Sequence, residues 1–209
     1  KEYAKTASDY KTTIETLLAS YTDKVNAFAI SKYETAYNKA EAAYNKAVGD
    51  IANFDKSIKE TALADVKKIL DDAQKVKEND DFAVKLDGIL LQFNLVDTKL
   101  AADKETAAKA QYELTIKYVD ELYAAESKVG THTEDYNKLY QDNVTEAKKA
   151  YVAIEDGKFF EGVTTTVYDK LAGYMSTIGD LVVGKDDKDK DIIEKHTAIY
   201  ISAYNEDVA

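Results

Sequence analysis

Apolar side chains recur every three or four residues along most of this chain, which is the spacing of one face of an α-helix. A first stripe, in residues 3–28, consists of Tyr3, Ala7, Tyr10, Ile14, Leu17 and Tyr21, continued by Val25 and Phe28. A second stripe keeps the same alternating steps for about four heptads and is the most regular pattern in the chain. It consists of Tyr33, Tyr37, Ala40, Tyr44, Ala47, Ile51, Phe54 and Ile58.

The two stripes are out of register between Phe28 and Tyr33. Ser31 lies at that point and Glu34 follows three residues later, which is the spacing of a capping box at a helix N-terminus. We therefore predict a helix break near residues 29–31. A continuous helix whose apolar stripe shifts is the alternative.

Helical spacing continues through the middle of the chain. Residues 61–78 form a third amphipathic segment, and Asn79–Asp81 would provide a loop and an N-cap. A regular stripe then covers residues 82–100. The stretch 101–110 contains strong helix formers but no large apolar side chain, so it is either part of one long helix or a short turn. The stripe resumes in residues 112–123.

Turn signals divide the last third of the chain. Thr131 and Glu134 form a second capping box, and Asp156–Gly157 predicts a turn. Residues 158–184 have helical spacing but contain several glycines and β-branched residues. The polar run 185–191 predicts a loop, which a last helix over residues 192–203 follows.

These segments predict an all-α protein, an elongated antiparallel bundle of about five to seven amphipathic helices. Because the chain offers many segments, partner helices would be supplied within it rather than by a coiled-coil oligomer. We expect a single domain over residues 1–209, with possible sub-bundles 1–79 and 80–209. The oligomeric state is left open by the sequence.

Composition narrows the classes of function. The 209 residues include no Pro, Cys, Trp or Arg, and the net charge is −11. Without cysteine there are no disulfides, thiolate metal sites or cysteine nucleophiles. Without arginine, and with this negative charge, we expect no binding to nucleic acid or to an anionic membrane surface. No apolar run is long enough for a transmembrane segment. Because residue 1 is Lys, we expect a processed or trimmed chain, and any targeting segment would have preceded residue 1.

The candidate catalytic and metal-binding residues are few. His196 lies in the apolar stripe of the last helix, and His132 lies near a helix start, without a Glu-x-x-His pair or a zinc-protease motif. Asp187, Asp189 and Asp191 have the one-three-five spacing of a calcium loop. The sixth and twelfth loop positions do not fit, however, and lysines neutralise the run. We therefore expect no catalytic residue, no cofactor and no metal site.

Tyrosine is unusually frequent, with 16 copies. Most tyrosines lie on the helical stripes, where a ring can pack inward and leave its hydroxyl at the wet boundary of a narrow bundle. The alternative is an interaction or sugar-stacking surface, which we place around Tyr33, Tyr37 and Tyr44.

The leading functional hypothesis is a non-enzymatic structural or interaction protein, a helical spacer or adhesion-type module of the cell surface or extracellular space. It would have a protein or glycan partner. The alternative is a helical-bundle binding protein that holds a small molecule, glycan or metal between helices, with the glycine-containing segment 157–184 leaving room for the ligand. An enzyme that uses His132 or His196 with carboxylates is a third hypothesis.

Overall fold

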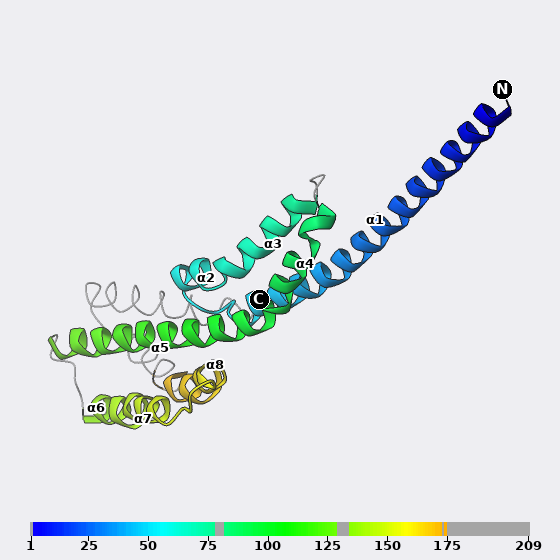
Figure 1. Cartoon of the computed structure of the whole chain (residues 1–209). Helices are drawn as coiled ribbons and strands as arrows, with labels where there is room; N and C mark the ends of the chain where they lie inside the picture. The colour runs from blue at the N-terminus through cyan, green and yellow to red at the C-terminus, as the bar shows by residue number, and fades with distance from the viewer. Residues whose placement is uncertain (1, 78–81, 129–133, 173, 175–209) are drawn as a thin grey trace. The chain divides into compact units, whose positions relative to one another are not determined.

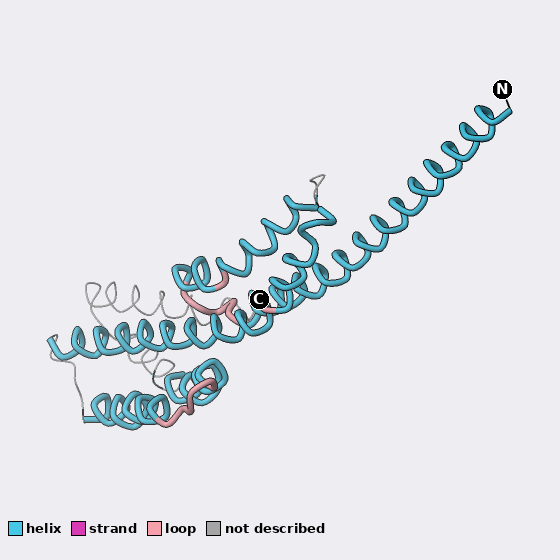
Figure 2. The backbone as a smooth tube through the Cα atoms, in the orientation of Figure 1, coloured by secondary structure: helices cyan, strands magenta, loops and turns pink. Residues whose placement is uncertain are grey.

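The computed structural model describes residues 2–77, 82–128, 134–172 and 174, and the regular structure of these residues is entirely helical (Figure 1). The all-α prediction is thereby confirmed. The elements are α1 (Glu2–Asp50), α2 (Lys56–Ala62), α3 (Ala64–Lys77), α4 (Phe82–Asn94), α5 (Val96–Lys128), α6 (Glu134–Tyr140), η1 (Gln141–Thr145), α7 (Glu146–Val152), α8 (Phe159–Glu161) and η2 (Gly162–Val167). Figure 2 shows the short loops between them, at residues 51–55 and 153–158.

Two compact units share the chain. Unit 1 consists of residues 1–45 and 65–97, and unit 2 consists of residues 46–64 and 98–209. Each unit is therefore assembled from two separate stretches of sequence. The predicted single domain, with possible sub-bundles 1–79 and 80–209, stays a prediction.

The predicted break near residues 29–31 is wrong, because α1 runs without interruption through this region. Ser31 is an interior helical residue whose carbonyl accepts a hydrogen bond from Thr35 Oγ1 at 2.9 Å. Glu34 does not reach back to a cap, since its Oε1 lies 2.9 Å from Lys77 Nζ of α3. A cap is worth about 1 kcal/mol, whereas a break would give up several backbone hydrogen bonds. The alternative, a continuous helix with a shifted stripe, is the one observed.

The second stripe was predicted as one helix as far as Ile58, but α1 ends at Asp50. Ile51 and Phe54 still belong to a core, being 2% exposed each, although they lie in a loop. Asp55 then caps α2, with its side chain accepting a hydrogen bond from Ser57 N at 2.9 Å. Gly49 next to Asp50 lowers the helix propensity here, and Asp55 offers a better N-terminus.

Three helices form the core of unit 1. α3 and α4 lie beside the second half of α1 and cover its stripe from Ala29 onward (Figure 1). The buried apolar side chains of unit 1 are Ala29, Tyr33 and Ala40 of α1, Val66, Leu70 and Ala73 of α3, Phe82, Ile89 and Phe93 of α4, and Val96 at the start of α5. The predicted segment 61–78 corresponds to α3, while the predicted loop Asn79–Asp81 lies outside the described residues.

The long helix α5 organises unit 2. The stretch 101–110, which the sequence left open, is a continuous part of this helix. Ala107 and Ala108 are 3% and 0% exposed, so the small side chains allow close packing. The stripe predicted over residues 82–100 is instead divided at Leu95, between α4 and α5. Leu95 N donates to Gln92 O at 3.0 Å, which closes a tight turn.

Polar side chains of α5 hold the loops of unit 2 by their backbone. Gln111, only 3% exposed, accepts a hydrogen bond from Asp55 N at 2.6 Å. Glu105 accepts hydrogen bonds from Phe159 N at 2.6 Å and from Phe160 N at 3.2 Å, which satisfies the free donors at the start of α8. Both contacts connect segments more than fifty residues apart in sequence.

The last described segments of unit 2 contain two π-helical turns. η1 continues directly from α6 into α7, and η2 follows α8 without interruption. The predicted turn at Asp156–Gly157 is confirmed, since Gly157 has φ of 81°, a conformation that favours glycine. Thr131 of the predicted second capping box, the loop 185–191 and the last helix 192–203 lie outside the described residues.

Candidate interaction surface

The most distinctive surface of the molecule is the apolar stripe on the first half of α1. We call the side chains Tyr3, Ala7, Tyr10, Ile14, Leu17, Tyr21 and Phe28 the N-terminal stripe, with Leu18 and Val25 along its edge. Tyr3 is 93% exposed, and the other large members are 62–68% exposed. None of the residues that the structure describes covers this stripe. Within unit 1, α3 and α4 lie beside the second half of α1 only (Figure 1).

The helix that carries the N-terminal stripe has weak intrinsic support. Four of its threonines bond back to the carbonyl four residues earlier, among them Thr12 to Ser8 O at 3.1 Å and Thr16 to Thr12 O at 2.9 Å. Threonine is a poor helix former, and in proteins most of the stability of a helix comes from the packing of its apolar face. Lys11 and Glu15 form an exposed ion pair at 3.8 Å, which contributes little. A covering partner would therefore stabilise this segment.

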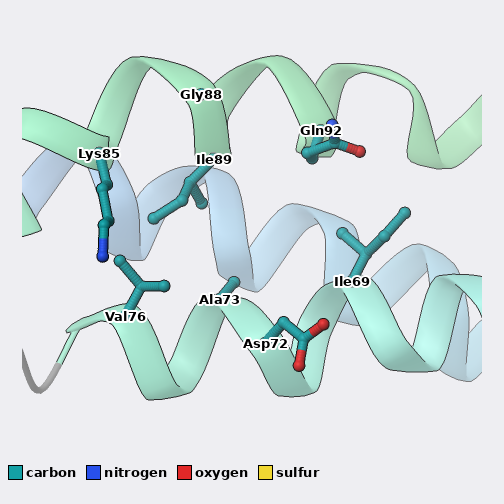
Figure 3. A pocket seen from close by; sticks show the side chains of 8 residues that line it. All are labelled: Ile69, Asp72, Ala73, Val76, Lys85, Gly88, Ile89 and Gln92. Atoms are coloured by element: carbon teal, nitrogen blue, oxygen red, sulfur yellow. The ribbon is translucent and has the colours of Figure 1, made fainter.

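A second candidate site is a groove of about 300 Å³ between α3 and α4 in unit 1 (Figure 3). It is lined by Ile69, Asp72, Ala73 and Val76 of α3 and by Lys85, Gly88, Ile89 and Gln92 of α4. A Cβ atom added at Gly88 would meet nothing within 4 Å. Small residues thus create the space, and the lining combines an apolar floor with three polar side chains. No tyrosine lines it.

The sequence predicts space for a ligand in a different segment, residues 157–184. At Gly162 this space is filled, because an added Cβ would lie 2.7 Å from the side chain of Ile154. The other glycines of this segment beyond Gly157 lie outside the described residues. Gly88, in contrast, lines a groove and has no turn or cap to form.

The predicted surface tyrosines Tyr33, Tyr37 and Tyr44 lie in unit 1. Tyr33 is 2% exposed and packs against Phe82 and Phe93, with ring centroids at 5.4 and 5.8 Å. Tyr37 and Tyr44 are half-buried. Tyr33 is thus a core residue, as predicted for most of the tyrosines, and in this conformation it offers no surface to a partner. A role of Tyr37 and Tyr44 in recognition stays a prediction.

The Tyr33 hydroxyl is an unusual group. Its oxygen is buried and has no hydrogen-bond partner among the described residues. Burial, and secondarily the neighbouring Tyr37, raise the pKa of Tyr33 to about 12. Tyr37 does have partners, since its hydroxyl donates to Glu41 at 3.1 Å and accepts from Gln74 Nε2 at 2.6 Å.

Unit 2 contains a cluster of one lysine, one aspartate and one tyrosine. Lys148 Nζ lies 3.0 and 2.9 Å from the two oxygens of Asp120, and Tyr140 Oη donates to the same carboxylate. Burial, followed by the hydrogen bond and charge of Asp120, raises the pKa of Tyr140 well above its ordinary value. A tyrosine that keeps its proton at neutral pH suits a structural hydrogen bond, not a general base.

The remaining candidates from the sequence fall outside these sites. His132, His196 and the aspartates Asp187, Asp189 and Asp191 lie outside the described residues. Among the residues that are described, no three His, Asp or Glu side chains gather as a metal site would require. None of the helices described is long and apolar enough to cross a lipid bilayer.

Comparison with known proteins gives no family for this chain. No protein-family model matches the sequence, and no curated protein or solved structure is significantly similar to it. A function of this chain is therefore inferred from its own surface.

Proposed function

We propose that this protein is a non-enzymatic interaction protein, a helical spacer or adhesion-type module that binds a protein partner through the N-terminal stripe. The observation that supports this is the exposure of six large stripe side chains, from 62% to 93%, on one helix face. Contiguous apolar surface of this size, rimmed by polar residues, marks interaction sites on soluble proteins. Tyrosine is also enriched at the centre of such sites.

The composition favours a protein partner over nucleic acid or an anionic membrane surface. The net charge of −11 and the absence of arginine oppose binding to nucleic acid or to anionic lipid. On the composition, we further propose an extracellular or cell-surface location. Labelling of intact source cells with a membrane-impermeant amine reagent tests the location, because the 28 lysines would react only if the protein is outside the membrane.

A photo-crosslinking amino acid at Leu17 tests the function. Leu17 belongs to the N-terminal stripe, and Ala19 on the outer face of the same helix is the matched control position. We expect crosslinks from position 17 to one defined protein, identified by mass spectrometry and reproduced with that protein purified. They should be absent from position 19 and lost with Ile14→Glu. Equal crosslinking from both positions, or none from position 17, would contradict the proposal.

The groove supports a second candidate function, the binding of a small apolar molecule. A volume of about 300 Å³ is at the lower end of the range for ligand sites. Gly88→Phe would fill the groove, because the glycine faces open space. An environment-sensitive apolar dye should bind the wild-type protein and not this variant, while Gly49→Phe, at another open helical glycine, should bind it normally. Dye binding that is equal in all three proteins would remove this candidate.

A further inference from the structure

We infer that the N-terminal stripe binds a second copy of this chain, and that two α1 helices pair antiparallel over residues 3–28. This inference rests on the proposed function and specifies its partner. In heptad terms, positions a are Ala7, Ile14, Tyr21 and Phe28, and positions d are Tyr3, Tyr10, Leu17 and Lys24. A two-fold interface requires that this face be complementary to itself.

One antiparallel register satisfies this requirement at every layer. When Ile14 faces Leu17 of the second copy, each a position faces a d position throughout the segment. The layers are Tyr3 with Phe28, Ala7 with Lys24, Tyr10 with Tyr21, and Ile14 with Leu17, each occurring twice about the two-fold axis. Two of these layers, Tyr3 with Phe28 and Tyr10 with Tyr21, pair aromatic rings, and such ring pairs are stabilised beyond the area that they bury.

The position of Lys24 favours an antiparallel over a parallel pair of helices. In a parallel, in-register pair, Lys24 would face Lys24 of the second copy between the two helices. Two like charges would then be desolvated together. In the antiparallel register it faces Ala7, the smallest member of the N-terminal stripe. The lysine stem can then pack over Ala7 while its ammonium group reaches water. The only charged residue at a core position is thereby accommodated.

The residues that lie on either side of the a and d positions create no like-charge contacts. On one side they carry Thr6, Thr13, Ser20 and Ala27, and on the other Lys11, Leu18 and Val25. In the antiparallel register Lys11 lies near Leu18 and Val25 of the second copy. The acidic residues Asp9, Glu15 and Asp23 lie on the outer face. The net negative charge of the protein is therefore kept away from the interface.

The exposed area is sufficient for a stable dimer. Four stripe aromatics are 62–93% exposed. At 150–250 Å² for each ring, they offer roughly 500 Å² of the ~800 Å² that each partner contributes to a standard interface. Ile14, Leu17, Leu18 and Val25, exposed by 42–64%, supply the remainder. The paired segment would be ~39 Å long.

Sedimentation equilibrium of the full 209-residue chain tests the self-association. We expect twice the chain mass at tens of micromolar, and the monomer mass for Ile14→Glu/Leu17→Glu. Thr12→Glu/Ala19→Glu adds the same charges on the outer face of the same helix and should stay dimeric. A monomeric wild-type protein, or equal dissociation of both double variants, would overturn the inference.

Cysteine crosslinking tests the orientation, and the chain has no cysteine of its own. A mixture of the Ala7→Cys and Lys24→Cys proteins should form a mixed disulfide on mild oxidation. Neither variant alone should crosslink, because residue 7 of one copy lies ~25 Å from residue 7 of the other in the antiparallel register. Efficient crosslinking of each variant with itself would show a parallel pair and overturn the antiparallel assignment.

Failure of this inference can be told from failure of the proposed function. If the chain is monomeric but position 17 crosslinks a different protein, the interaction function stands and the self-pairing is wrong. If position 17 crosslinks neither a second copy nor another protein, both are wrong. Crosslinks from position 17 that join two copies, together with dimeric mass, support both.

Discussion

The two halves of α1 carry the same pattern and have opposite surroundings. Residues 3–28 and residues 33–47 both alternate steps of four and three between apolar positions. Every described side chain from Lys5 to Phe28 is exposed, whereas Ala29, Tyr33, Ala40 and Ala47 are 2–5% exposed. The pattern thus determines that a helix forms and which of its faces is apolar. Whether that face is covered depends on where the rest of the chain returns.

The shift between the two apolar stripes explains why the same packing helices do not cover both halves of α1. Phe28 and Tyr33 are five residues apart, which places their side chains about 140° apart around the helix axis at 3.6 residues per turn. Partners that cover the second half, such as α3 and α4, therefore lie on a different side of the helix from the N-terminal stripe. A straight helix can present two interaction faces in this way without a break.

Removing one ring from each half should give the largest difference. Tyr33→Ala should lower the free energy of unfolding by about 3–5 kcal/mol, because it empties an aromatic core position. Tyr21→Ala should change it by less than about 0.5 kcal/mol at protein concentrations too low for self-association. Urea denaturation followed by circular dichroism measures both. Similar losses would mean that the two halves are equally covered.

Alkaline pH should act on the second half of α1 through Tyr33. The folded-state pKa is raised from 10.0 to about 12, so the folded state holds this proton more tightly than the unfolded chain. The resulting stability is complete below pH 10 and is lost as pH rises toward 12. Urea midpoints measured between pH 9 and 12 should therefore fall less steeply for Tyr33→Phe than for the wild-type protein. Parallel curves for the two proteins would contradict this.

The hydroxyl of Tyr33 should cost stability at neutral pH. Tyr33→Phe should raise the free energy of unfolding by about 1 kcal/mol, because a buried polar group without a partner among the described residues is removed and the ring is kept. Tyr21→Phe, on the exposed half, is the matched control and should have no effect. A loss of stability in Tyr33→Phe would reveal a partner for the hydroxyl outside the described residues.

The smallest effect is expected at the helix that covers the second half of α1. Gly88→Ala should stabilise unit 1 by about 0.5–1 kcal/mol, because the helix gains propensity and the new methyl group meets nothing within 4 Å. Gly162→Ala in unit 2 is the contrasting variant and should destabilise, since Ile154 would have to move. Thermal unfolding measures both. An equal gain in both would contradict the packing at Gly162.

The sequence predicted the all-α fold because helical periodicity is local and strong in this chain. It did not predict the continuity at Ser31, because a capping box is a weak signal when no glycine or proline stops the helix. It could not decide on residues 101–110, because Ala107 and Ala108 can be buried or exposed with similar ease. Their burial depends on the helices that pack against α5.

The sequence predicts an interaction surface on the second half of α1, whereas the large apolar side chains of the first half are the exposed ones. The predicted residues are Tyr33, Tyr37 and Tyr44 of the most regular stripe, and a role of Tyr37 and Tyr44 stays a prediction. The strongly exposed rings are those of Tyr3, Tyr10 and Tyr21. Periodicity alone does not separate a covered stripe from an uncovered one, because both require the same spacing. The five-residue step after Phe28 was the available signal, and it was interpreted as a break.

The interleaving of the two units has a consequence for synthesis on the ribosome. Ile51 and Phe54 emerge early, but the ring that Phe54 packs against is that of Phe160, at 6.2 Å, more than a hundred residues later. At typical rates of translation, Phe160 is synthesised about 5–20 s after Phe54. Unit 1, in contrast, is complete once residue 97 has emerged. The nascent chain therefore carries a folded first unit beside an uncovered apolar segment, which is the kind of surface that chaperones protect.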